Sequence, residues 1–266
     1  MNIPFAKLES VGNDFVLVEA RHVPHTDLAE LARRMCARRF GVGSDGLLII
    51  GEDHEGWCLR MFNPDGSEDF CGNGLRCAVS YAHRRMDAPA EFSLWHRGLS
   101  VSVSVAGGEV TTILPPATYA PEEVPHTLSE PIIDHPVAGY EGSALSTGST
   151  HFVIFREELP DDEEFFAASP KIEHACFFPD RTSVMWAKED EDTISIRIWE
   201  RGVGETLGCG TGATAVAVEQ ARRTGQMGEY TVRSKGGSLS ITVDALDQPL
   251  RIVGQPHHAF DGVWSD

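Results

Sequence analysis

Short hydrophobic runs recur along the whole chain and predict many β-strands. Their β-branched and aromatic residues, several alternating with polar ones, are typical of strands. Helical spacing of apolar residues occurs over 27–38, 73–86 and 211–223. The pattern therefore predicts an α+β chain with many strands and few helices. The strand-like runs are FVLVEA, LLIIG, CLRMF, LSVSVSV and VTTIL in the first half, and HFVIF, SVMWA, ISIRIW, YTVRS, LSITV and LRIVG in the second.

Two of the expected helices begin with related sequences, which indicates an internal duplication. CGNGLRCAVSYAHRR starts at Cys71 and CGTGATAVAVEQARR starts at Cys209, 138 residues later. Aligned without gaps, they share the cysteine, both glycines and the final Arg-Arg pair. SVGNDFVLV from Ser10 and STGSTHFVIF from Ser146 form a second match, 136 residues apart with one residue inserted.

A third match makes chance an unsatisfactory explanation: Gly66 and Gly204 each stand five residues before their cysteine. Three matches in one order predict two pseudo-symmetric lobes. The proline-rich stretch PPATYAPEEVP at 115–125 is typical of a boundary. We therefore expect an N-terminal lobe over 1–117, completed by about 254–266, and a C-terminal lobe over 118–253.

Composition and charge limit the partners of this chain. An apolar fraction of 41% and a charged fraction of 23% are those of a globular protein. A formal net charge of −18 argues against nucleic acid or an anionic membrane surface as the main partner. Much of the excess lies in the runs 157–164 and 188–193, which we expect to be solvated loops or turns.

The chain has no stretch typical of a signal peptide or a membrane span, so we expect a cytoplasmic protein. Its six cysteines should then be reduced thiols. No CxxC pair supports a zinc ribbon, and neither cysteine loop offers further ligands at metal spacing, so no metal is expected. Cysteines outside the repeat are expected to be inert, buried packing residues. These are Cys36, Cys58, Cys77 and Cys176.

The repeated unit itself suggests acid–base chemistry. Glycines at 72, 74, 210 and 212 would allow a tight backbone that points N–H groups at one spot, where a helix begins. A helix N-terminus binds anions such as carboxylates, and it favours ionisation of a neighbouring thiol. If the lobes face each other across a cleft, one thiolate could remove an α-proton while the opposed thiol protonates the other face. Such a reaction inverts a stereocentre without redox change or cofactor.

At this point the motifs resemble those of the diaminopimelate epimerase family, cofactor-independent enzymes of bacterial lysine and peptidoglycan synthesis. The resemblance extends in order from about residue 5 to residue 262. It implies that each lobe is a curved, mostly antiparallel sheet wrapped around a central helix, with the active site between the lobes. It also implies a homodimer and a small diamino dicarboxylic acid as substrate. The matching stretches are SVGNDF, GVGSDGLL (41–48), FNPDGSEDFCGNGLRC (62–77) and ERGVGETLGCGTGA (200–213).

The resemblance also assigns roles to individual residues. Cys71 and Cys209 match the two catalytic cysteines, and His151 matches a histidine close to the reaction centre, a candidate for proton relay. Residues matching the carboxylate cradle contribute main-chain amides: Gly72, Asn73, Gly210 and Thr211. Residues matching those that hold the amino groups and the distal carboxylate are Asn13, Asn63, Glu200 and Arg201, with Glu200 also a catalytic candidate. Arg201 has a direct physical argument as well, because guanidinium binds carboxylate bidentately.

Two departures from the family pattern leave the substrate open. The chain reads GSTH where the family usually has GNPH, which places Ser149 at a substrate-contacting Asn; FPDRTSVMW places Ser183 at another. Serine is shorter than asparagine and has fewer donors. The alternative is a related racemase of another amino acid, such as histidine or proline, although Arg201 favours a second carboxylate.

The residues bear on three other classes of protein. A non-catalytic amino-acid-binding protein could use the same amides, but it would not need duplicated thiols. A thiol redox protein could pair the two cysteines, although in the family such oxidation inactivates. A pyridoxal-phosphate racemase is disfavoured because none of the four lysines, at 7, 171, 188 and 235, has a recognisable Schiff-base setting.

Overall fold

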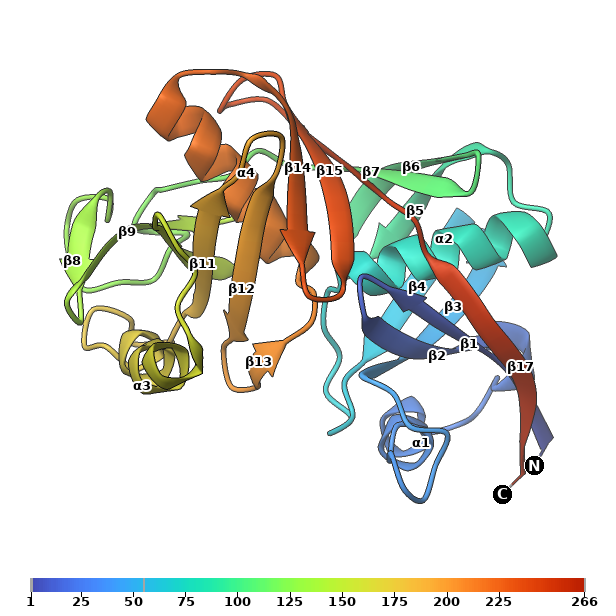
Figure 1. Cartoon of the computed structure of the whole chain (residues 1–266). Helices are drawn as coiled ribbons and strands as arrows, with labels where there is room; N and C mark the ends of the chain where they lie inside the picture. Colours follow the sequence, from blue (N-terminus) through green and yellow to red (C-terminus); the bar gives the residue numbers. More distant parts are fainter. Residues whose placement is uncertain (1, 55, 266) are drawn as a thin grey trace. The chain divides into compact units, whose positions relative to one another are not determined.

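The computed structural model describes residues 2–54 and 56–265. The chain divides into two compact units, Met1–Ile113 with Val253–Asp266, and Leu114–Ile252 (Figure 1). No helix in the described part of the chain is long and apolar enough to cross a membrane. The mixture of many strands with four α-helices over the described ranges confirms the predicted α+β class.

The N-terminal unit has the following elements: β1 (Asn2–Ser10), β2 (Asn13–Glu19), the short 3-10 helix η1 (Ala20–His22), α1 (Leu28–Met35), β3 (Gly46–Asp53), β4 (Gly56–Phe62), α2 (Gly72–Arg85), β5 (Glu91–His96), β6 (Leu99–Ala106), β7 (Glu109–Leu114) and β17 (His257–Ser265). Strand β17 pairs antiparallel with β1 and so brings the two ends of the chain together.

The remaining elements follow in the C-terminal unit, with β16 running to its border: β8 (His135–Val137), β9 (Tyr140–Ser146), β10 (Thr150–Phe155), α3 (Asp162–Glu173), β11 (Ser183–Glu189), β12 (Ile194–Glu200), β13 (Gly204–Thr206), α4 (Gly210–Thr224), β14 (Gly228–Ser234), β15 (Gly237–Val243) and β16 (Leu250–Gly254).

Strand pairing repeats between the two units and confirms the internal duplication. In the first, β2 and β3 are parallel, β3 and β4 antiparallel, β4 and β5 parallel, and β5 and β6 antiparallel. In the second, β10–β11, β11–β12, β12–β14 and β14–β15 follow the same alternation. Gly66 and Gly204 both have positive φ, +89° and +103°, so the matched glycines share a backbone conformation.

Each unit encloses one helix. Helix α2 contacts β1, β2, β3, β4 and β6, and α4 contacts β9, β10, β11, β12, β14 and β15. Residues 73–80 of α2 and 212–221 of α4 are all buried, as expected for a helix surrounded on every side rather than lying on a surface. Figure 1 shows α2 and α4 running among the strands of their own units.

Glycines allow these helices to approach the strands closely. A Cβ atom on Gly74 would lie 2.8 Å from Leu48 Cδ2, and one on Gly212 would lie 2.5 Å from Met185 Sδ. Both glycines lie within helices and have no positive φ. The structure therefore adds a packing reason for these two glycines, because a side chain at either position would clash with a neighbouring strand.

Gly212→Ala is expected to destabilise the protein by about 1–3 kcal/mol, because the added methyl group overpacks the contact with Met185. Gly72→Ala is the matched control, since its Cβ would meet only Arg76 Nη1, at an ordinary 3.8 Å. Denaturant unfolding of both variants measures the difference. Equal stability of the two variants would contradict the close-packing explanation.

One acidic run differs from its prediction. Within 157–164, expected to be loop or turn, Asp162 already begins α3, and Asp161 caps that helix by accepting from the Glu164 amide at 2.9 Å. Three acidic residues in the first turn interact favourably with the positive end of the helix dipole. The negative charge of this run therefore stabilises the start of a helix. In the second run, β11 extends to Glu189 and a turn precedes β12.

Candidate active site

Cys71 and Cys209 occupy the same structural position. Each is the N-cap of its buried helix, with φ and ψ of −141° and 110° for Cys71 and −133° and 112° for Cys209. Each sulfur accepts a hydrogen bond of 3.4 Å from the amide three residues later, that of Gly74 or Gly212. The amides of a first helical turn have no partner inside the helix, so both N-termini can bind an anion. The repeated sequence thus produces a repeated thiol-and-amide site.

In the N-terminal unit, Asn13 lies against the cysteine. Its Oδ1 atom is 3.7 Å from Cys71 Sγ and accepts from Asn73 Nδ2 at 3.4 Å, while its Nδ2 donates to Asp45 Oδ2 at 2.7 Å. Arg76, fully buried in α2, donates to Asn73 Oδ1. Three predicted residues therefore meet here, joined by two charged residues that the sequence did not single out.

His96 supports the same cysteine from behind. Its Nε2 accepts from the Cys71 backbone N–H at 3.0 Å, and its Nδ1 lies 3.1 Å from the Leu59 carbonyl oxygen. Burial lowers the pKa of His96 to about 4, although the bond to Leu59 acts to raise it. The ring is thus neutral near pH 7, and its two nitrogens have the roles that both bonds need. Phe70 stacks on the ring with centroids 4.7 Å apart.

In the C-terminal unit, four predicted residues form one chain of contacts. Cys209 Sγ lies 3.5 Å from Thr211 Oγ1, which lies 3.2 Å from Ser149 Oγ. Ser149 Oγ lies 2.9 Å from His151 Nε2. His151 is therefore linked to the sulfur by contacts through two hydroxyl groups. Sequence reasoning found all four residues but not the order in which they connect.

His151 is completely buried in β10. Burial, and to a smaller extent the positive charge of Arg201, lowers its pKa to about 3, so the ring is neutral near pH 7. Its Nδ1 atom has no hydrogen-bond partner within residues 2–54 and 56–265. A neutral imidazole can hold or pass a proton only through Nε2 in this arrangement.

Ser183 and Arg201 are joined directly. Ser183 begins β11 opposite His151 in the parallel pairing, and its Oγ accepts from the Arg201 backbone N–H at 3.1 Å. The Arg201 side chain is exposed and donates to the Asp180 carbonyl oxygen at 3.2 Å. Ser183 thus holds the backbone of the arginine and leaves the guanidinium at the surface.

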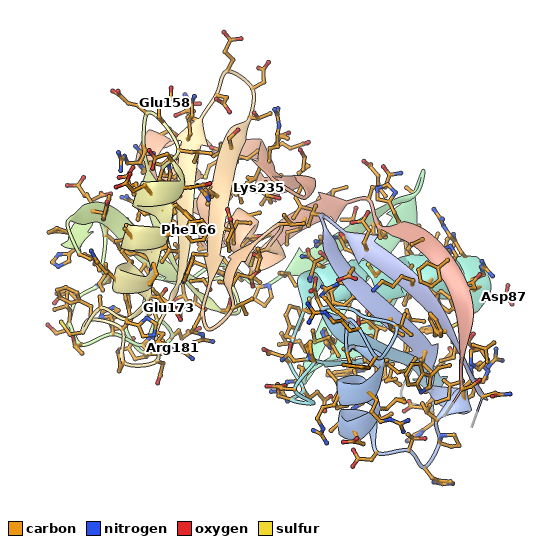
Figure 2. All side chains as sticks on the ribbon, turned by 60° about the horizontal axis from the view of Figure 1, so that its bottom comes forward. Asp87, Glu158, Phe166, Glu173, Arg181 and Lys235 are labelled. Carbon is orange, nitrogen blue, oxygen red and sulfur yellow. The ribbon has the colours of Figure 1, made fainter. Side chains whose placement is uncertain are left out.

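A buried carboxylate anchors the turn that follows Arg201. Glu173, at the end of α3, is 3% exposed and accepts from the Gly202 amide at 2.8 Å, Trp199 Nε1 at 2.7 Å and Arg181 Nη1 at 3.3 Å. Figure 2 shows Glu173 and Arg181 as neighbours beside α3. Nothing in the sequence pattern pointed to Glu173, because the helix that carries it was not predicted.

Two further predicted residues lie at the ends of strands. Glu200 ends β12, and its Oε1 accepts from Thr206 Oγ1 at 2.5 Å. Asn63 follows β4 and donates from Nδ2 to Ser67 Oγ at 3.1 Å within the turn that contains Gly66. Both side chains are half-buried, so each retains surface for a ligand.

The cysteines outside the repeat differ among themselves. All six are free thiols in the described structure, as expected. Cys36 and Cys77 are buried, and burial raises the pKa of both thiols, which suits inert packing residues. Cys58 is half-buried. The expectation of burial was wrong for Cys176, which is exposed in the segment after α3.

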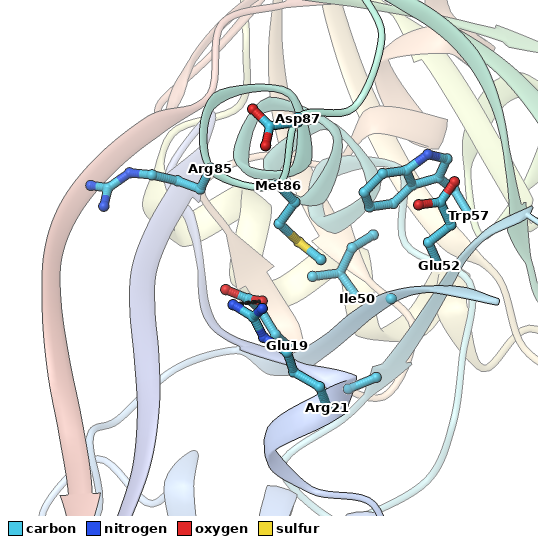
Figure 3. Close-up of a pocket in the computed structure, with 10 residues that line it drawn as sticks. Glu19, Arg21, Ile50, Glu52, Trp57, Arg85, Met86 and Asp87 are labelled. Carbon is cyan, nitrogen blue, oxygen red and sulfur yellow. Dashed lines mark ion pairs between the residues drawn. The ribbon is translucent and has the colours of Figure 1, made fainter.

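A pocket in the N-terminal unit lies at the other end of α2. It has a volume of about 450 Å³ and is lined by Glu19, Ile50, Trp57, Arg85 and Met86 among others (Figure 3). Cys71 begins the helix, whereas this pocket adjoins its last turn. The pocket is therefore separate from the predicted residues.

Comparison with known proteins identifies the family. The diaminopimelate epimerase family matches residues 5–118 and 143–257. The chain is 35% identical to a diaminopimelate epimerase of Microcystis aeruginosa, with 99% of each sequence covered. It is also 35% identical to one of Moorella thermoacetica, with 97% of this chain and 98% of the relative covered.

Solved structures share the fold at much lower identity. A phenazine biosynthesis protein of the PhzF family from Enterococcus faecalis matches with a TM-score of 0.72 and 13% identity, covering 100% of both chains. A hydroxyproline epimerase from Agrobacterium vitis matches with a TM-score of 0.69 and 14% identity, covering 99% of this chain and 91% of that one. With a thiol capping the buried helix of each duplicated unit, and with curated relatives over 99% of its length, this chain is an isomerase and belongs to the diaminopimelate epimerase family.

Proposed function

We propose that this protein interconverts LL- and meso-diaminopimelate by proton transfer between two cysteines at one α-carbon. The observation that carries the proposal is the identical N-cap placement of Cys71 and Cys209 on two buried helices of a duplicated fold. Family membership supplies the substrate class. The reaction needs neither a redox change nor a cofactor, since a proton is removed from one face and another is delivered to the opposite face.

In this mechanism one cysteine is a thiolate and the other a thiol. The thiolate removes the α-proton, and the thiol protonates the resulting carbanion from the other side. The α-carboxylate takes up charge in the transition state, and the first-turn amides at Gly72, Asn73, Gly210 and Thr211 would stabilise it. The proposal requires the N-termini of both helices to reach the same substrate molecule.

Recognition of the distal end would fall to residues on the turns. Arg201 would bind the second carboxylate through its guanidinium. Glu200 can accept from a substrate ammonium group, and Asn13 and Asn63 match family positions among those that hold the amino groups and the distal carboxylate. This assignment explains why a dicarboxylic substrate is favoured over a monocarboxylic one.

The two serines that depart from the family pattern each have structural partners. Ser183 Oγ accepts from the Arg201 amide, and Ser149 Oγ contacts both Thr211 and His151. Each hydroxyl thus bonds to a proposed site residue of its own unit. The proposal therefore assigns these serines to holding Arg201 and Thr211, with a direct substrate contact as a secondary role.

The proposal includes a cytoplasmic homodimer. Six free thiols suit a reducing compartment, and the family resemblance supports the dimer. A net charge of −18 supports a small ligand rather than nucleic acid or an anionic membrane as the partner.

The function is tested by incubating the purified protein with LL-diaminopimelate under reducing conditions, without added cofactor, and following the meso isomer by chiral chromatography. Histidine and proline are run in parallel. The proposal predicts turnover of diaminopimelate far above that of either monocarboxylic amino acid. Racemisation of histidine or proline without turnover of diaminopimelate would assign the alternative substrate class, and binding without turnover would indicate a sensor.

A further inference from the structure

The two thiols occupy equivalent positions but face different chemical groups. The residues at the positions of Asn13 and Asn73 in the N-terminal unit are Ser149 and Thr211 in the C-terminal unit, 136 and 138 residues later. The Cys71 sulfur therefore contacts one side-chain amide that is bonded to a second, whereas the Cys209 sulfur contacts one hydroxyl group that is bonded to a second. This difference bears on which cysteine carries the proton before substrate binds.

Charged groups fix the orientation of both amides in the N-terminal unit. A carboxylate only accepts, so Asn13 must turn its NH2 group toward Asp45, at 2.7 Å. At the other end, a guanidinium only donates, so Asn73 must turn its carbonyl toward Arg76. The Asn13 carbonyl oxygen is then left facing Cys71 Sγ, at 3.7 Å. That oxygen can only accept.

A carbonyl oxygen beside a sulfur favours the protonated thiol. The S–H group can donate to it, whereas a thiolate would meet the negative end of the amide dipole. The Gly74 amide, at 3.4 Å, can donate to either form of the sulfur. Neutral His96 holds the Cys71 backbone N–H and adds no charge. The polarity set by Asp45 and Arg76 thus stabilises Cys71 as a thiol.

The hydroxyl chain in the C-terminal unit has the opposite polarity. His151 is fully buried, and its Nδ1 finds no partner in the part of the chain that the structure describes. An unsatisfied buried N–H is costly, which places the ring proton on Nε2, where it can be donated to Ser149. Ser149 is then free to donate to Thr211, and Thr211 to Cys209 Sγ. All the hydrogens in this chain point toward the sulfur.

A sulfur that accepts from a hydroxyl and from the Gly212 amide is best satisfied as a thiolate. We infer that in the free enzyme Cys209 is the thiolate and Cys71 holds the proton. The inference rests on the proposed function, which requires one of each. Burial, with a smaller contribution from the positive charge of Arg201, lowers the pKa of His151 and keeps the ring neutral.

The reaction follows with atoms balanced. Cys209 S⁻ takes the α-proton and becomes a thiol, while Cys71 S–H gives its proton to the opposite face and becomes a thiolate. Proton exchange with solvent then restores the starting pair. The free enzyme is therefore ready for the stereoisomer whose α-hydrogen faces Cys209, and the other isomer binds the less populated form.

The inference is tested by alkylating the full-length protein with iodoacetamide over a range of pH and mapping each cysteine by mass spectrometry. Thiolates react and thiols do not, so the pH at which each rate reaches half its maximum reports ionisation independently of access. We expect Cys209 to reach half-maximum at a pH at least one unit below that of Cys71. Exposed Cys176 provides a reference in the same digest. An equal or reversed order for the two cysteines would overturn the inference.

Thr211→Val removes the terminal hydroxyl donor at nearly constant volume. It should raise the half-maximal pH of Cys209 by about one unit and leave that of Cys71 unchanged, because a charge-assisted hydrogen bond is lost. Thr211→Ser, which keeps the hydroxyl, should behave like the unmodified protein. A Cys209 profile that is identical in both variants would contradict the hydroxyl chain. If diaminopimelate is epimerised but Cys71 ionises first, only this inference falls; absence of epimerisation would overturn the proposed function, whatever the order of the thiols.

Discussion

Cys209→Ser is expected to lower kcat for epimerisation by about 10²–10⁴-fold, the range that a positioned acid or base contributes. The same loss is expected for Cys71→Ser. A serine hydroxyl is a far weaker acid than a thiol, and its pKa lies far above the pH of the reaction. It therefore cannot serve as the anionic base near pH 7. Initial rates of meso-isomer formation measure the effect.

The serine variants separate chemistry from structure. Each cysteine caps its helix by accepting the amide of Gly74 or Gly212, and serine is among the preferred N-cap residues. Stability to denaturant should therefore be retained or increased while activity is lost. Cys176→Ser, at an exposed position away from the repeat, should leave both properties unchanged. Full activity of either Cys71→Ser or Cys209→Ser would rule out the two-cysteine mechanism.

Arg201→Leu is expected to lower kcat/KM for diaminopimelate by about 10²–10³-fold, because a bidentate charge-assisted contact with the distal carboxylate is lost. The loss should appear mainly in KM, since the distal carboxylate does not change during proton transfer. Steady-state kinetics with both stereoisomers measure the split.

Two controls accompany that variant. Arg233→Leu removes an exposed arginine of the same unit, whose Nη2 donates only to Thr193 Oγ1 among the hydrogen bonds described for its side chain, and it should retain activity. Arg201→Lys keeps the positive charge but loses the bidentate geometry of the guanidinium, so its kcat/KM should lie between those of the unmodified protein and Arg201→Leu. A kcat loss with unchanged KM would place Arg201 in the chemical step and contradict its assignment to the distal carboxylate.

The sequence allowed the duplicated parts of the fold to be predicted because their signals are local. Hydrophobic alternation marked β10, β11 and β12, and the CGxG pair marked the starts of α2 and α4. Helix α3 was missed because its first turn is acidic and Pro170 interrupts its pattern. Strand β17 was missed because it is largely exposed, and it forms by pairing with β1 at the other end of the chain.

In the candidate site, too, only residues with a local sequence signal could be predicted. Motif residues such as Cys71 and Ser149 could be found because their neighbours in the sequence identify them. Arg76, His96 and Glu173 act through contacts with residues on other elements or on another helical turn, and no short motif records those contacts. Their shared signal is a polar group at a position that packing would otherwise give to an apolar residue. Only the fold shows that each of these groups is buried.

The two-base mechanism is tested most directly by running the reaction from LL-diaminopimelate in D2O and analysing both isomers by mass spectrometry at low conversion. A thiol delivers solvent-derived hydrogen to the face opposite the one that lost a proton. The account predicts one deuterium in nearly every molecule of newly formed meso isomer and almost none in the remaining LL isomer. Meso isomer that retains the original α-hydrogen would show that a single group carries the proton across, and would contradict the paired roles of Cys71 and Cys209.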